Sequence, residues 1–246
     1  MVVLEVEGVS KTFRIPDVQR DTVREHALAL FRPRRFRDLK VLDDVSFQLQ
    51  QGETLGIIGR NGSGKSTLLK IIAGIYQPLR GRVVRHTPIT PILELGLGWN
   101  AELDAVDNVY LIGSVMGLTL PKIREAMDEI LAFAELEAFA NLKLQHYSTG
   151  MAARLAYAVA FHAVRDVLIL DEIFAVGDLR FRTRCLERYR ALIATGHSVL
   201  LVTHDSTAAA LCDRALLLEG GQIVMEDAPE RIWNEHVRRL TAPEVE

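Results

Sequence analysis

Apolar and polar residues alternate over short stretches of this chain, and leucine or β-branched runs lie between those stretches. Alternation at residues 2–6 and 45–49 predicts strands with one buried face. Runs at residues 54–58, 167–170 and 198–203 are rich in leucine, isoleucine and valine, which is typical of strands buried in a parallel sheet. These segments predict a sheet whose central strands have no solvent-facing side.

Helical segments separate these strands. A helix is predicted over residues 65–73, where Gly74 closes it, and another over residues 120–140, with Pro121 near its start. An alanine-rich helix is predicted over residues 148–164. The chain therefore contains both the hydrophobic periodicity of strands and that of helices.

The remaining segments are a hairpin, a terminal helix and a basic stretch. Residues 215–219 and 222–226 flank two glycines, which predicts a β-hairpin, and residues 229–240 predict a polar helix. The basic stretch covers residues 14–40, and within it residues 18–31 have the spacing of a short amphipathic helix.

Strands that alternate with helices predict an α/β fold with a parallel sheet. The helix-rich block at about 94–159 interrupts the alternation, and we expect it to form a subdomain. The core then comprises about 1–93 and 160–226, and a C-terminal helix follows at about 228–240. One domain with a subdomain suits a chain of 246 residues.

The composition narrows the class of protein. Apolar residues make up 49% and charged residues 25%, which suits a globular protein, and the net charge of −3 provides no basic field for nucleic acid. Cys185 and Cys212 have no metal-type spacing, so we expect buried free thiols in a reducing compartment. We find no signal peptide and no apolar run of about 18 residues, so a transport role requires another chain to form the pore.

A phosphate-binding loop is predicted at residues 59–66, which read Gly-Arg-Asn-Gly-Ser-Gly-Lys-Ser and fit G-x-x-x-x-G-K-[ST]. Glycines let successive backbone N–H groups point at an anion, and the helix that follows adds its positive end. Lys65 is expected to reach the β- and γ-phosphates, and the Ser66 hydroxyl is expected to bind Mg²⁺. The predicted nucleotide-binding residues here are Gly59, Asn61, Gly62, Ser63, Gly64, Lys65, Ser66 and Thr67.

Two acids end the predicted strand at residues 167–170. Such a strand delivers Asp171 and Glu172 to the edge of the sheet where ligands bind. Asp171 is expected to hold Mg²⁺ directly or through water, and Glu172 to orient and polarise the attacking water. An acidic loop after a strand is common, so the phosphate loop earlier in the chain is what makes this pair a catalytic candidate.

Residues 147–151, Tyr-Ser-Thr-Gly-Met, resemble the L-S-G-G-Q signature of ATP-binding cassette (ABC) proteins. Three further residues resemble family features in position and order along the chain. Phe13 resembles the aromatic that stacks on adenine, and Asp178 resembles the aspartate after the catalytic glutamate. His204 resembles the switch histidine. Each also has a plainer interpretation, because Ser148 suits a helix N-cap and the histidine and phenylalanine suit structural roles. The resemblance covers nearly the whole chain, and its joint order carries the inference.

The signature departs from the family pattern at two positions. Thr149 replaces a glycine and Met151 replaces the glutamine, whereas Ser148 and Gly150 are kept, so the resemblance implies that this hydroxyl and this close backbone approach serve ATP. The family's glutamine between the phosphate loop and the signature is not evident. Glu94 is its nearest equivalent by position, and we expect it to take part in Mg²⁺ or water coordination.

Several stretches resemble one branch of the family, the ATPases of O-antigen, capsule, teichoic-acid and galactan exporters. They are residues 93–99, residues 107–110, residues 147–151 followed by 154–157, residues 171–172 followed by 175–178, and the basic insertion before residues 41–46. Some members of that branch carry a C-terminal β-domain that recognises the glycan end. This chain ends at Glu246, so we expect no such recognition within it.

The resemblance implies a P-loop NTPase fold, with a RecA-like parallel sheet, N-terminal antiparallel strands and a helical ABC subdomain. It implies an ATPase that uses ATP and Mg²⁺ to drive a lipid-linked polysaccharide across the cytoplasmic membrane. Two chains would pair head to tail beneath two polytopic membrane subunits, peripheral on the cytoplasmic side of the inner membrane. Contact with the glycan would be indirect, and no nucleic acid is expected. Residues 96–118 are the candidate surface for the membrane subunit or a packing face of the subdomain.

Other interpretations stay open. The chain fits an ABC ATPase for another transported substrate, or a soluble ABC ATPase that acts on nucleic acid or ribosomes, although it has no long coiled-coil insertion and no second cassette. A P-loop kinase or GTPase would leave the signature and His204 unexplained. The arginines between residues 14 and 40 either face anionic headgroups or a lipid-pyrophosphate substrate, or form a solvated surface.

Overall fold

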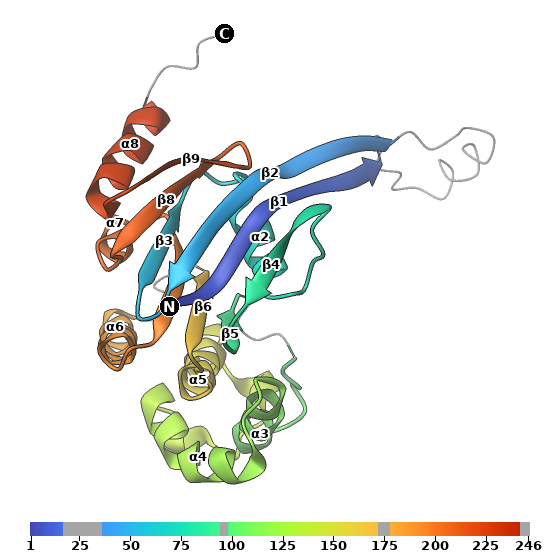
Figure 1. Ribbon diagram of the computed structural model, residues 1–246. Helices are drawn as coiled ribbons and strands as arrows, with labels where there is room; N and C mark the ends of the chain where they lie inside the picture. Colours follow the sequence, from blue (N-terminus) through green and yellow to red (C-terminus); the bar gives the residue numbers. More distant parts are fainter. Residues whose placement is uncertain (17–35, 94–97, 172–177, 242–246) are drawn as a thin grey trace, which may run out of the picture.

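Five parallel strands and one antiparallel edge strand form the larger of two sheets in the computed structural model, which describes residues 1–16, 36–93, 98–171 and 178–241 (Figure 1). The strand order is β5-β6-β7-β3-β8-β9. The strands are β3 (Thr54–Ile58), β5 (Ile89–Ile92), β6 (Val167–Asp171), β7 (Ser198–Thr203), β8 (Arg214–Glu219) and β9 (Gln222–Asp227). The predicted parallel sheet and the hairpin at the two glycines are confirmed.

A smaller antiparallel sheet has the order β2-β1-β4, with β1 at Val2–Pro16, β2 at Phe36–Gln50 and β4 at Arg80–Arg85. It confirms the N-terminal antiparallel strands, but β1 and β2 run far into the basic stretch, beyond the lengths predicted from alternation. Register shifts between Val6 and Lys11 break the alternation, and the outer part has little buried surface to impose it. The helix predicted at 18–31 lies outside the described residues.

The predicted helices are present with shifted ends. They are α2 (Lys65–Ile72), α4 (Leu120–Ala134), α5 (Thr149–His162) and α8 (Pro229–Thr241). The helix α4 ends before the predicted residue 140, because Glu135 adopts a left-handed conformation with φ 59° and a short 3₁₀ turn, Glu137–Phe139, follows. The additional helices are α3 (Ala105–Val115), α6 (Leu179–Ala194) and α7 (Ser206–Ala209).

Helix α6 was not anticipated from the sequence, although it carries a helical apolar pattern. Its buried side chains are Phe181, Cys185, Tyr189 and Leu192, spaced by three or four residues. Charged residues fill the positions between them and mask this stripe in a linear reading. Both free cysteines are buried, as expected.

Three apolar clusters show how the layers are held together. One joins the smaller sheet, α2 and one face of the larger sheet, and a second joins the opposite face to α5 and α6. A third lies among α3, α4 and α5, which group together at the bottom of Figure 1. No helix within the described residues has both the length and the apolar character needed to cross a bilayer. The expected division into a core and a helical subdomain at 94–159 stays a prediction.

Candidate nucleotide-binding site

The loop between β3 and α2 is the predicted phosphate loop, and two of its glycines are sterically required. A Cβ added at Gly59 would lie 2.2 Å from the Leu218 carbonyl oxygen, so only glycine fits against β8 there. Gly64 caps α2 with φ 105°, a conformation that L side chains rarely adopt. The backbone is therefore held in a tight turn that leads straight into a helix N-terminus.

A buried cation lies inside this loop. The Lys65 side chain is only 6% exposed, and its Nζ donates hydrogen bonds to the carbonyl oxygens of Gly59 at 2.6 Å and Arg60 at 3.0 Å. The Ser63 hydroxyl is also buried, and it has no hydrogen-bond partner among the residues that the structure describes. A cation, an unsatisfied hydroxyl and the N-terminal N–H groups of α2 together form a site with the chemistry to bind an anion.

The edge of the larger sheet brings the other candidates to the same place. In the register of the sheet, Ile58 at the end of β3 pairs with Thr203 of β7, and Asp171 of β6 pairs with Val202. The phosphate loop, Asp171 and the exposed His204 therefore follow neighbouring strands at one carboxyl edge, as the sequence predicted.

Ser66 and Asp171 meet at this edge although 105 residues separate them. The Ser66 hydroxyl donates a hydrogen bond to the Asp171 carboxylate at 3.1 Å. A hydroxyl and a carboxylate are hard oxygen ligands of the kind that Mg²⁺ prefers, with water and substrate phosphates supplying the rest. The described residues contain no group of three His, Cys, Asp or Glu placed to hold a metal, so this pair fits Mg²⁺ bound together with a phosphate. Glu94 and Glu172 lie outside the described residues.

Phe13, the predicted adenine-stacking residue, lies in β1 and contacts Tyr76, which follows the C-terminal end of α2. The two rings meet edge to face with centroids 5.7 Å apart. The Lys11 ammonium lies 5.3 Å from the Phe13 ring centroid and donates to the Gln77 carbonyl oxygen at 2.6 Å. These contacts fix the orientation of Phe13, and the sequence reasoning missed Tyr76 because it carries no motif.

Replacing Tyr76 with alanine is expected to raise the KM for ATP by about 2- to 12-fold with little change in kcat, the usual worth of an edge-to-face pair. The physical reason is that Phe13 loses the ring that holds it in position. Steady-state ATPase kinetics would measure both constants. Tyr76→Phe should keep the wild-type values, and Ile75→Ala, at a neighbouring side chain that is 61% exposed, serves as the matched control. An unchanged KM in Tyr76→Ala would contradict the role.

The signature residues lie at the start of α5. The Ser148 hydroxyl caps the helix by accepting from the Met151 N–H at 3.2 Å. A Cβ added at the exposed Gly150 would meet no described atom closer than the Ser148 hydroxyl at 3.8 Å, so packing inside the chain does not require glycine there. Helix α5 packs on α3, α4 and α6, whereas α2 packs on β2 and β6. The signature therefore presents an open helix N-terminus to the outside of the chain.

Asp178 belongs to a cluster of ion pairs that the sequence motifs did not predict. Its carboxylate caps α6 by accepting from the Phe181 N–H at 2.9 Å and pairs with Arg154 at 2.6 Å. The helix cap and then Arg154 lower the pKa of Asp178, so it stays ionised. Arg154 also pairs with Glu135 at 2.9 Å, and Glu135 pairs with Arg184 at 3.0 Å. The cluster ties the signature helix to α4 and to the start of α6.

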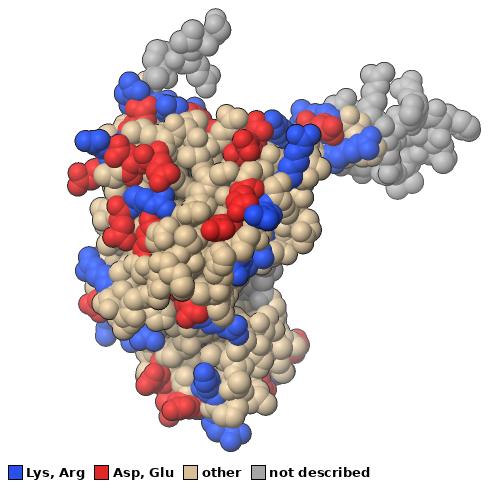
Figure 2. Space-filling view, viewed as in Figure 1, with Lys and Arg blue, Asp and Glu red and all other residues tan. Residues whose placement is uncertain are grey.

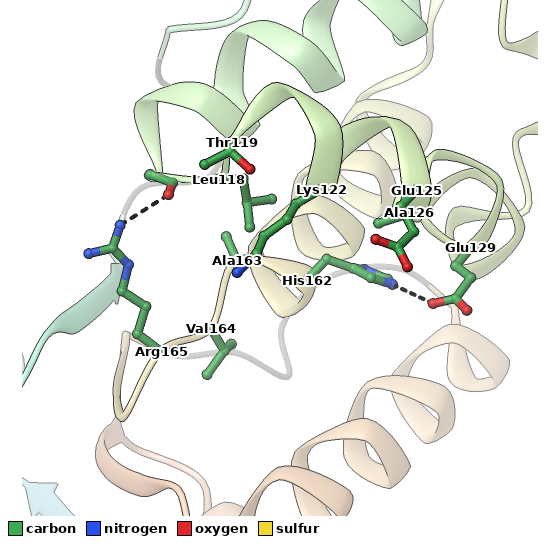
Figure 3. Close-up of a pocket in the computed structure, with 11 residues that line it drawn as sticks. Leu118, Thr119, Lys122, Glu125, Ala126, Glu129, His162, Ala163, Val164 and Arg165 are labelled. Atoms are coloured by element: carbon green, nitrogen blue, oxygen red, sulfur yellow. Dashed lines mark hydrogen bonds and ion pairs between the residues drawn. The ribbon is translucent and has the colours of Figure 1, made fainter.

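A hollow of about 380 Å³ lies away from the phosphate loop, between the α3–α4 turn and the end of α5 (Figure 3). Lys122 points into it, and His162 faces Glu129 across it with 3.5 Å between the ring nitrogen and the carboxylate. The Arg165 guanidinium donates to the Gly117 carbonyl oxygen at 3.1 Å. The mixed charge of this lining offers neither the cation excess nor the glycine loop of the site above.

Comparisons with known proteins agree on one family. Residues 42–175 match a family model described as ABC transporter. The ABC transporter protein AbcA of Aeromonas salmonicida is 36% identical over 239 residues, which cover 97% of this chain and 77% of that protein. The O-antigen export system ATP-binding protein RfbB of Klebsiella pneumoniae is 36% identical over 210 residues, or 82% of this chain and 85% of that protein. A solved structure of an ATP-binding subunit of an ABC transporter superposes with a TM-score of 0.74 at 26% identity, covering 96% of this chain and 94% of its own.

Proposed function

We propose, because the chain belongs to the ABC transporter family, that it is the ATP-hydrolysing subunit of an exporter that moves a lipid-linked surface polysaccharide across a membrane. The observation that carries hydrolysis is the buried Lys65 in its glycine loop beside the Ser66–Asp171 pair. The observation that carries the substrate class is the O-antigen export named for a relative that this chain covers over most of its length. The P-loop fold expected from the sequence is the fold observed.

In the proposed reaction, the loop amides and Lys65 bind the phosphates of ATP and neutralise their charge. To bind ATP, the Lys65 ammonium exchanges its carbonyl partners on Gly59 and Arg60 for phosphate oxygens. Ser66 and Asp171 would hold Mg²⁺, which would supply positive charge at the β- and γ-phosphates. Glu172, next in the chain after Asp171, orients and polarises the attacking water, and His204 contacts the γ-phosphate side from the neighbouring strand end.

The two halves of the site come from different copies of the chain in this proposal. The N-terminus of α5 points away from its own chain, and the Ser148 hydroxyl and the bare Gly150 backbone suit a phosphate that arrives from outside. A head-to-tail homodimer places this helix end over the partner's phosphate loop. Each dimer then holds two ATP molecules, and Asp178 lies at the junction between its halves.

A surface for the membrane subunit lies at the far end of the helical layer. Leu111, Val115 and Leu120 expose large apolar side chains at the end of α3 and the start of α4. The hollow lined by Lys122 and Arg165 adjoins them. Residues 96–118 were the sequence candidate for this contact, and the exposed apolar group overlaps their C-terminal part. In this proposal the protein binds peripherally to the membrane subunits at the cytoplasmic side, where ATP is available.

The test is ATPase stimulation. The chain co-purified with the polytopic membrane protein encoded beside it should hydrolyse ATP faster when a lipid-linked polysaccharide is present than with the lipid carrier alone. Val115→Asp should remove this stimulation and leave basal hydrolysis intact, because residue 115 is 77% exposed and far from the phosphate loop. Glu187→Lys, an exposed change on α6, serves as the control. Stimulation by ribosomes or DNA in place of the glycan would overturn the proposal.

A further inference from the structure

The outer ends of β1 and β2 leave the body of the molecule as a two-stranded ribbon (Figure 1). We call residues 14–16 and 36–40 the outer ribbon. Within the described residues, β4 pairs with β1 only as far as Ser10 opposite Arg80, so the outer ribbon has no third strand. A two-stranded ribbon without a core beneath it has only marginal stability in water. Contact with a further surface would stabilise it.

The outer ribbon exposes apolar and cationic side chains together. Phe36 is 44% exposed and Leu39 is 47% exposed, although both are large apolar residues. The Arg14 guanidinium stacks over the Phe36 ring at 4.9 Å from its centroid. Arg37 is also exposed, but strand alternation places it on the opposite face of the ribbon, together with Leu39. Aromatic rings beside cations on a projecting element are typical of the interface between lipid headgroups and acyl chains.

The charge of this region is opposite to that of the rest of the chain. The sequence of residues 11–40 contains nine Lys or Arg and four Asp or Glu, which gives +5, whereas the whole chain carries −3. Eight of these thirteen charged residues lie in 17–35, outside the described residues, and the outer ribbon itself carries three cations and Asp38, a net of +2. Figure 2 shows blue side chains, with red ones among them, where the ribbon leaves the body. A local positive field on an otherwise acidic protein favours one orientation against an anionic surface.

We propose that the outer ribbon binds the anionic headgroups of a lipid bilayer, with Phe36 on one face of the ribbon and Leu39 on the other entering the interface. Arg14 and Arg37 contact headgroup phosphates in this arrangement, whereas Lys40 is already paired with Asp43 at 2.5 Å. The proposal rests on the proposed function for its setting, because an ATPase docked on a membrane subunit stays within reach of the bilayer. Two cations near an anionic leaflet are expected to raise vesicle binding by at least roughly tenfold over a neutral membrane.

The experiment uses the full chain and extruded vesicles. Co-sedimentation is measured with pure phosphatidylcholine and with about 30% phosphatidylglycerol, each at low and at roughly 0.5 M salt. Wild type should bind the anionic vesicles at least tenfold more strongly, and salt should weaken that binding. Arg14→Glu with Arg37→Glu should abolish the preference. Phe36→Ser should weaken the binding that remains at high salt.

The matched control is Arg182→Glu with Arg190→Glu, the same charge change on exposed arginines of α6. This control should bind vesicles like wild type, and the urea midpoints of all variants verify that they fold. Equal binding to both membranes, an equal loss in ribbon and control variants, or binding to single-stranded RNA in place of vesicles would overturn the inference. Basal ATPase separates the two proposals: a chain that hydrolyses ATP without vesicle preference refutes only the ribbon, and a vesicle-binding chain without ATPase refutes only the function.

Discussion

Glu172→Gln is expected to lower ATP turnover by roughly 10²- to 10⁴-fold and to leave ATP binding intact, since this is the usual worth of a positioned base. The carboxylate follows directly on Asp171, which the sheet register places opposite Val202 and which accepts a hydrogen bond from Ser66. An amide has nearly the same shape but cannot take up a proton or polarise water to the same degree. Turnover is measured as phosphate release, and binding by equilibrium titration with a fluorescent ATP analogue.

The matched control for this substitution is Glu187→Gln, which makes the same change at an exposed position of α6. Its turnover should equal that of wild type. Asp171→Asn provides the contrast, because removing the partner of Ser66 should weaken the response to Mg²⁺ as well as turnover. Near-normal turnover in Glu172→Gln would refute the assignment of Glu172 as the base.

The strand, loop and helix that form the phosphate site were predictable because each is specified locally. Residues 54–58 form β3 at the predicted positions, and the helix begins at Lys65 as expected. Gly64 is required by its own backbone conformation, with φ 105°, whereas the need for glycine at position 59 comes from Leu218 of β8, which is distant in the chain. The contact between Ser66 and Asp171 was predictable indirectly, from the strand assignments, because buried parallel strands end at a common edge of the sheet.

Features that depend on distant partners were not predictable. Backbone hydrogen bonds, interrupted by several register shifts, fix the long pairing of β1 with β2. Such bonds do not depend on the alternation of apolar and polar side chains, so the sequence pattern does not reveal them. The early end of α4 depends on Glu135, whose strained backbone conformation accompanies ion pairs to Arg154 and Arg184. The sequence around Glu135 does not indicate that Arg154 and Arg184 are its partners, because they lie 19 and 49 residues away in the chain.

The exposed N-terminus of α5 makes the dimeric site testable without disturbing the helix. Ser148→Asp keeps an oxygen that can accept from the Met151 N–H, because aspartate caps helices as well as serine does. It also places a negative charge where the partner's ATP phosphate is expected. We therefore expect hydrolysis to fall by on the order of 10²-fold, with nucleotide binding to the monomer unchanged. Ser148→Thr, which keeps the hydroxyl and the cap, should retain activity.

Mixing two inactive variants decides whether the signature acts on its own chain or on the partner. Lys65→Ala removes the buried cation of the phosphate loop, and Ser148→Asp blocks the signature. A mixed dimer pairs the intact loop of the Ser148→Asp chain with the intact signature of the Lys65→Ala chain, so one of its two sites is complete. Random assortment should then restore about a quarter of wild-type turnover, as expected for a symmetric dimer. Activity that stays at the level of the separate variants, although mixed dimers form, would refute the shared site, as would loss of monomer binding in Ser148→Asp.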